Sequence, residues 1–191
     1  MRVLVACEFS GIVRDAFAAR GHDAWSCDLE PAEKPGQHYQ GNILDLLDPR
    51  DWDLVIAFPP CTYLAVSGNR WHATSPRRHQ AAAFALQLLN WPAPAVAIEN
   101  PRSSLSTLIR PPDQIIQPWQ FGHGETKTTC LWLRGLMPLQ PTRHVPGRAP
   151  RVLMEPAGGP DPQWKRRSRT CQGIADAMAD QWTGPFPMTL F

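Results

Sequence analysis

Two short apolar runs each end in a turn that proline stiffens, and this pattern restricts the fold more than any other feature. The run Asp53–Ala57 is followed by Phe58-Pro59-Pro60-Cys61, and the run Ala95–Ile98 by Glu99-Asn100-Pro101. Proline fixes φ and has no backbone N–H, so each run is predicted to be a buried strand that stops there. Ligands collect at the carboxyl ends of strands in open α/β sheets. If the two strands are parallel neighbours, Cys61 and Glu99 meet across one pocket.

The rest of the first hundred residues alternates between strand and helix patterns. Strands that alternate with helices are typical of an α/β fold with a mostly parallel, doubly wound sheet. A serine cap followed by proline at the first helical position marks the start of the longest predicted helix. The predicted elements are strands at Val3–Ala6 and His22–Cys27, helices over Ser10–Arg20 and Pro76–Asn90, and a short strand or turn at Ile43-Leu44.

The second half has weaker periodicity. Gln114–Trp119 and Thr129–Leu133 are predicted strands that form an antiparallel hairpin at the sheet edge. Residues 135–169 are a basic insertion rich in proline, and residues 170–183 are a closing helix that turns Ile174, Ala175, Met178 and Trp182 inward. We expect residues 1–191 to form a single domain, because the chain is long enough for one sizeable core.

Composition excludes several classes of protein. The net charge is only +2, and no apolar run is long enough to predict a membrane span or a secretory signal. The five cysteines are scattered without a C-x-x-C pair, which favours reduced thiols and a cytoplasmic location. His123 and Cys130 have a spacing that matches no common zinc pattern, so we expect no metal site.

Three features at strand ends point to an adenosine-type cofactor. Phe9-Ser10-Gly11 joins the first strand to the first helix, where a glycine lets a ligand approach the backbone. Asp28 closes the second strand, the place where nucleotide-binding sheets position an acid for ribose hydroxyls. Asn42, with Ile43 beside it, offers an amide for an adenine edge. Each feature alone fits an ordinary turn; their order along the chain favours the cofactor.

The same features, with Pro-Pro-Cys and Glu-Asn-Pro, resemble DNA cytosine-5 methyltransferases in their order along residues 2–101. The chain is similar to the small phage-encoded type, which lacks a separate target-recognition domain. The resemblance implies a Rossmann-like domain that binds S-adenosyl-L-methionine. Phe9, Ser10, Gly11 and Pro59 would then lie near the cofactor, Asp28 would bind its ribose, and Asn42 and Ile43 would flank its adenine.

The resemblance also implies a mechanism on a cytosine that is flipped out of DNA. Cys61 would add to C6 of the ring, Glu99 would hydrogen-bond N3 and the exocyclic edge, and C5 would accept the methyl group. Pro60 and Asn100 would contact the base. The family's arginine strand is not plainly present, and Lys127 is the residue that could take an arginine's part at the pyrimidine O2.

Several basic residues could hold DNA without a recognition domain. Arg166, Arg167 and Arg169 stand beside Trp164, and basic residues with an aromatic ring suit phosphates and bases; a solvated loop is the alternative. Arg70 and Trp71 could enter DNA or cap the pocket, or simply lie on the surface. The tail that ends in Leu190-Phe191 resembles peptides that dock on the bacterial sliding clamp, although a tail folded back on the sheet fits as well.

The sequence therefore predicts methyl transfer to C5 of cytosine in DNA through a covalent Cys61 adduct. One alternative keeps Cys61 and moves the chemistry to a free pyrimidine nucleotide, with the arginines on its phosphate. Another is a catalytically silent DNA-binding or clamp-tethered module that keeps only the methyltransferase fold. No membrane partner is expected.

Overall fold

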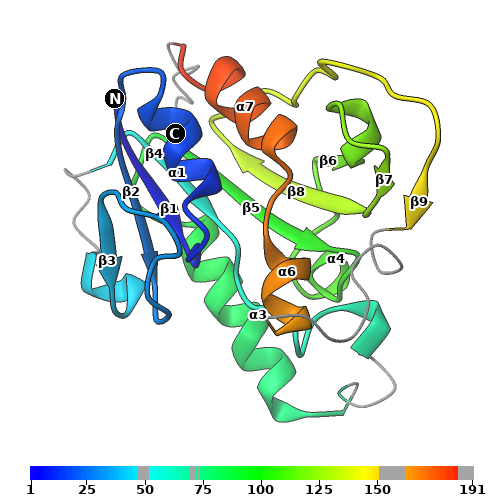
Figure 1. Cartoon of the computed structure of the whole chain (residues 1–191). Helices are drawn as coiled ribbons and strands as arrows, with labels where there is room; N and C mark the ends of the chain where they lie inside the picture. Colours follow the sequence, from blue (N-terminus) through cyan, green and yellow to red (C-terminus); the bar gives the residue numbers. More distant parts are fainter. Residues whose placement is uncertain (47–51, 69–71, 73, 151–161, 185–191) are drawn as a thin grey trace.

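The computed structural model describes residues 1–46, 52–68, 72, 74–150 and 162–184. Seven strands form one sheet in the order β3-β2-β1-β4-β5-β8-β6 (Figure 1). The first five are mutually parallel, and β8 runs antiparallel to both of its neighbours. The strands are β1 (Arg2–Ala6), β2 (Asp23–Asp28), β3 (His38–Gln40), β4 (Leu54–Ala57), β5 (Ala95–Pro101), β6 (Gln114–Ile116) and β8 (Thr129–Arg134).

This topology confirms the predicted α/β fold with a Rossmann-like, mostly parallel sheet and an antiparallel edge pair. The strand order reverses between β1 and β4, and a ligand crevice forms at such a switch point. β4 and β5 are parallel neighbours, in register from Leu54 opposite Ala95 to Ala57 opposite Ile98. Cys61, in the turn after β4, and Glu99, near the end of β5, therefore lie at the same edge of the sheet.

Helices cover both faces of the sheet (Figure 1). Helices α1 (Ile12–Ala18) and α7 (Gln172–Gln181) pack with one set of strand side chains, and α3 (Pro76–Leu89) and α4 (Leu105–Leu108) with the other. The central strands are apolar and buried on both faces, as parallel sheets require. Each predicted inward residue of α7 is buried, and Ser75 accepts a hydrogen bond from the Arg77 N–H at the start of α3.

The structure differs from the sequence-based expectation in five places. β5 continues to Pro101, so Glu99 and Asn100 lie within the strand, and β6 ends at Ile116, before a 3₁₀ turn. Ile43-Leu44 belongs to a 3₁₀ turn, η1 (Ile43–Leu46). The third strand is instead β3, which is short and only half-buried and therefore shows no apolar run in the sequence. β8 lies between β5 and β6, so the later strand of the pair is the inner one. The end of the basic segment forms helix α6 (Gln163–Ser168).

The remaining short elements lie in the second half or beside the Cys61 turn. They are η2 (Val66–Gly68), η3 (Pro118–Gln120), β7 (Glu125–Thr126) and β9 (Ala149–Pro150). Among the described residues, every helix is too short or too polar to cross a bilayer. Arg70, Trp71 and the Leu190-Phe191 tail lie outside the described residues.

Candidate active site

The turn after β4 is fixed to the segment after β5. The Cys61 carbonyl accepts hydrogen bonds from the N–H groups of Leu64 (2.9 Å) and Ala65 (2.8 Å), which closes a tight turn behind the thiol. The Leu64 carbonyl then accepts from the Ser104 N–H at 2.9 Å. Cys61 itself is exposed, whereas Pro59 is buried. The nucleophile candidate therefore stands at the surface of a turn that has little freedom to move.

Asn100 joins the two strand ends directly. Its side chain is 1% exposed, and its Nδ2 donates a 2.9 Å hydrogen bond to the Pro59 carbonyl. Its Oδ1 is buried without a hydrogen-bond partner in the structure. A buried acceptor without a partner is costly, so this oxygen is a group that a bound donor could satisfy. In this structure Asn100 acts mainly as a positioning residue for the Pro-Pro-Cys turn.

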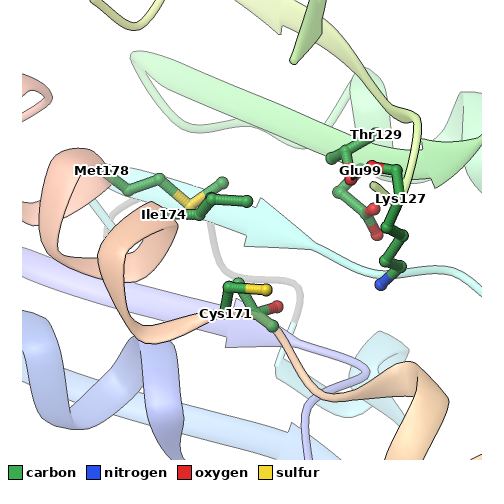
Figure 2. Close-up of a pocket in the computed structure, with 7 residues that line it drawn as sticks. Glu99, Lys127, Thr129, Cys171, Ile174 and Met178 are labelled. Carbon is green, nitrogen blue, oxygen red and sulfur yellow. Dashed lines mark hydrogen bonds between the residues drawn. The ribbon is translucent and has the colours of Figure 1, made fainter. Parts of the chain in front are cut away.

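Glu99 lies at the end of β5, beside Lys127 and Thr129 (Figure 2). Its side chain also borders a small cavity of about 10 Å³, which is lined by Cys171 at the N-cap of α7 and by Ile174 and Met178 within the helix. Burial raises the pKa of the Glu99 carboxyl, while the Lys127 charge and the Thr129 side chain oppose that rise. The result is a carboxyl that holds its proton more readily than a solvated glutamate does.

The charges of Glu99 and Lys127 also affect the pKa of the Cys61 thiol. Desolvation raises its pKa above the 9.0 of an ordinary cysteine, the Glu99 charge raises it further, and Lys127 lowers it. The thiol side chain reaches solvent, yet it stands in a hollow with protein on several sides. Lys127 is therefore the group that favours the ionised form of both residues.

These residues open into one cleft of about 420 Å³, within the usual size range of small-molecule sites. The cleft gathers ten of the residues predicted from the sequence, whereas Gly11, Asp28, Asn42, Ile43 and Arg166 do not line it. The ten are Phe9, Ser10, Pro59, Pro60, Cys61, Glu99, Asn100, Lys127, Arg167 and Arg169.

The end of β1 forms the other wall of the cleft and is ordered by Glu8. This buried carboxylate accepts from the Val13 N–H (2.7 Å), the Arg14 N–H (3.3 Å) and the Ser10 hydroxyl (3.1 Å). The predicted cofactor residue Ser10 is thus engaged within the protein. Burial raises the pKa of Glu8, and its hydrogen bonds oppose the rise.

Gly11 serves the packing of a buried arginine. Its φ is 71°, and a Cβ at this position would overlap the Arg14 guanidinium. Arg14 is 1% exposed and donates to the Ser26 hydroxyl at 3.2 Å and the Pro35 carbonyl at 3.0 Å. The glycine is needed here without any ligand, although a cofactor could still lie close by.

Asp28 ends β2, and Asn42 and Ile43 follow β3, all three outside the cleft. Asp28 accepts from the Glu30 N–H at 3.0 Å, and burial raises the pKa of its carboxyl. Asn42 Oδ1 accepts from the Leu44 N–H at 3.1 Å, which is a local turn contact. Ile43 is 4% exposed.

The residues fit S-adenosylmethionine in part. An acid at the end of β2 suits ribose hydroxyls, and Phe9, Phe58 and Pro59 supply an apolar cleft wall. The exposed Asn42 can keep its turn contact and still offer its Nδ2.

Sequence reasoning missed several residues that line the cleft. Cys7, Glu8, Phe58, Ser67 and Thr170 are among them. Glu8 follows an apolar strand just as Glu99 does, so the same signal could have identified it. Cys7 has a backbone φ of 57°, which is uncommon for a residue other than glycine. Burial raises the pKa of its thiol to about 12.

One cluster of potential metal ligands lies beside the site. Ligand-type atoms of His123, Glu125 and Cys171 lie within 4.8 Å of one another. His123 Nε2 accepts a 2.9 Å hydrogen bond from the Gly173 N–H at the start of α7. The start of a helix carries partial positive charge, which opposes a cation. We therefore interpret this cluster as a packing contact between β7 and α7.

Comparison with known proteins finds a structural similarity at low sequence identity. No family model and no curated protein matches the chain. A solved structure of a candidate DNA modification methyltransferase encoded within an E. coli prophage aligns with a TM-score of 0.47 and 14% identity. The alignment covers 70% of this chain and 46% of that one, so this chain spans less than half of its length. Similarity at this level does not identify an activity.

Proposed function

We propose that the protein transfers a methyl group to C5 of cytosine in DNA, with Cys61 as a covalent nucleophile. The observation that carries this proposal is that Cys61, after β4, and Glu99, near the end of the adjacent parallel strand β5, open into one cleft. A thiolate is a strong nucleophile, and a carboxyl that retains its proton can protonate a ring nitrogen. A pyrimidine needs both groups, because addition at C6 places negative charge on the ring.

Cys61 and Glu99 would act together in the covalent addition to the ring. The Cys61 thiol loses its proton to solvent, and its sulfur forms a bond to C6 while the Glu99 carboxyl transfers its proton to N3. S-adenosylmethionine, when bound, supplies the methyl group that C5 accepts. Loss of the C5 proton to solvent then lets the sulfur–C6 bond break, and the N3 proton returns to Glu99.

Lys127 and Asn100 support these two groups. Lys127 lowers the pKa of Cys61, which favours the thiolate, and its ammonium suits the oxygen at C2 of the ring. Asn100 holds the Pro59 carbonyl, which keeps the nucleophile turn in place. Phe9 and Phe58 supply apolar walls of the cleft.

Trapping with a fluorinated base tests the proposal. An oligonucleotide with 5-fluorocytosine and S-adenosylmethionine should give a denaturation-resistant adduct, because C5 then carries no proton to lose. Mass spectrometry should place it on Cys61. The adduct should be absent for Cys61→Ser and retained for Cys7→Ser, a matched change of another thiol that lines the cleft.

The same experiment separates the alternatives. An adduct with 5-fluoro-dCMP and none with the oligonucleotide would move the chemistry to a free nucleotide. No adduct with either substrate, for a folded protein, would rule out the nucleophilic role of Cys61 and leave the silent module.

A further inference from the structure

Helix α6 divides its side chains between two surfaces. Lys165, and Arg169 directly after the helix, pair with acids of the loop between β2 and β3, and Arg169 also lines the cleft. Trp164, Arg167 and Ser168, at spacings of three and four, line the cleft. This is the arrangement that helical periodicity produces. The basic cluster that the sequence shows as one group therefore has two roles: Lys165 and Arg169 attach the helix, and Arg167 lines the cleft.

The first surface attaches α6 to the sheet. Lys165 Nζ lies 2.6 Å from Glu30 Oε2, and Arg169 donates to both carboxylate oxygens of Glu33 at 2.7 and 2.8 Å. A two-point arginine–carboxylate pair fixes orientation as well as position. The charges of Lys165 and Arg169 are thus balanced by acids of the same protein, and this attachment holds α6 at the mouth of the cleft.

The second surface offers a ring and a charge to the cleft. Trp164 is 54% exposed although it is a large aromatic side chain. The Trp164 ring packs on the Phe9 ring at an interplanar angle of 66°, with the ring centroids 5.9 Å apart. This contact supports the tryptophan from within the protein. Arg167 is on the same face of the helix and lines the same cleft as Cys61 and Glu99.

We propose that Trp164 and Arg167 form a single-strand DNA subsite, in which Trp164 stacks on a base and Arg167 holds a backbone phosphate. This inference rests on the proposed function, because it concerns the strand that presents the pyrimidine to Cys61. Stacking accepts any base and a phosphate carries no sequence information, so the subsite tolerates any sequence. In a duplex the base faces are covered by their neighbours, and the stacking contribution is lost unless a base is extruded.

Binding of oligothymidylate to the full chain tests this subsite without cofactor. The probe is a fluorescently labelled dT12, which contains no cytosine, and the readout is anisotropy at several salt concentrations. Trp164→Leu should weaken binding by at least about fivefold, whereas Trp164→Phe, which keeps a flat ring, should restore most of it. Duplex dA·dT should bind more weakly than dT12. Thermal unfolding of each variant checks that it folds.

A charge-matched pair of variants tests Arg167. Arg167→Gln should reduce the slope of log K against log salt by about 0.7, the contribution of one phosphate contact on a single strand. Arg20→Gln removes the same charge from the contact between α1 and α7, where Arg20 pairs with Asp180 at 2.6 Å, and should leave the slope unchanged. Equal slopes for the two variants would overturn the role of Arg167.

The remaining outcomes separate this inference from the proposed function. Wild-type affinity in Trp164→Leu, or equal binding of dT12 and duplex, would overturn the subsite even if the enzyme methylates DNA. Conversely, loss of dT12 binding in Trp164→Leu together with no Cys61 adduct would support the subsite and refute the chemistry.

Discussion

The two halves of the sheet edge differ in how their predicted residues are used. At the ends of β4 and β5, Cys61, Glu99 and Asn100 all face one cleft, and Asn100 joins the two turns through the Pro59 carbonyl. At the ends of β1 and β2, Phe9 and Ser10 line the cleft. Gly11 and Asp28 lie outside it, as do Asn42 and Ile43 after the neighbouring strand β3.

The difference shows which sequence patterns have a local explanation. Gly11 accommodates Arg14, and Asn42 closes its own turn on Leu44. Neither contact needs a ligand. Glu99, in contrast, is a desolvated carboxyl with a raised pKa that lines the same cleft as the Cys61 thiol. The β4–β5 end therefore carries the stronger evidence for chemistry.

The largest effect is expected from Glu99→Gln. Glutamine keeps the shape of the side chain and cannot transfer a proton to N3, so methyl transfer should fall by about 10²-fold or more. The measurement is the initial rate of methyl transfer to a cytosine-containing oligonucleotide.

Glu8→Gln provides the matched control at the other end of the cleft. Glu8 is also a buried acid in the cleft wall, but it accepts from the Val13 and Arg14 N–H groups. The Glu8→Gln variant loses one accepting oxygen, so its free energy of unfolding should fall by about 1 kcal/mol. Its rate of methyl transfer should fall much less than that of Glu99→Gln. Equal rate losses would refute the distinction between the two ends.

A smaller effect is expected from Asn100→Ala. The variant leaves the Pro59 carbonyl buried without its donor, so the free energy of unfolding should fall by about 1–3 kcal/mol. Urea unfolding measures it. Asn42→Ala, an exposed asparagine at the other end, should cost about 0.5–1 kcal/mol. A larger loss for Asn42→Ala would contradict the tighter coupling of the β4 and β5 turns.

Gly11→Ala should destabilise the protein without any ligand. An alanine in the left-handed region costs about 1–2 kcal/mol, and overlap with Arg14 adds to it. Gly21→Ala is the control, because Gly21 has a φ of 80° and no atom within 4 Å of a Cβ. Thermal unfolding should show a greater loss for Gly11→Ala than for Gly21→Ala. Equal losses would show that Arg14 simply moves aside.

The sequence predicted the strands that bear the site because each is an uninterrupted apolar run that proline stops. The α3 cap and the inward face of α7 were confirmed for a similar reason, since each is a local pattern. β3 was missed because His38-Tyr39-Gln40 pairs along an exposed edge and needs no apolar residues. The attachment of α6 to the β2–β3 loop could not be predicted from local patterns, because the partners Lys165 and Glu30 are far apart in the chain.

The smallest expected effect is a shift in the pH dependence of Cys61 alkylation. Because desolvation and Glu99 raise the pKa of the thiol, iodoacetamide should react with Cys61 at a rate that rises with pH toward a midpoint above 9.0. Glu99→Gln removes a negative charge and should move the midpoint down, whereas Lys127→Met removes a positive charge and should move it up. Both shifts should be small and shrink in high salt, since the thiol reaches solvent and the charges are screened. Mass spectrometry of the Cys61 peptide measures the rate, and shifts in the opposite directions would refute the arrangement of the three residues.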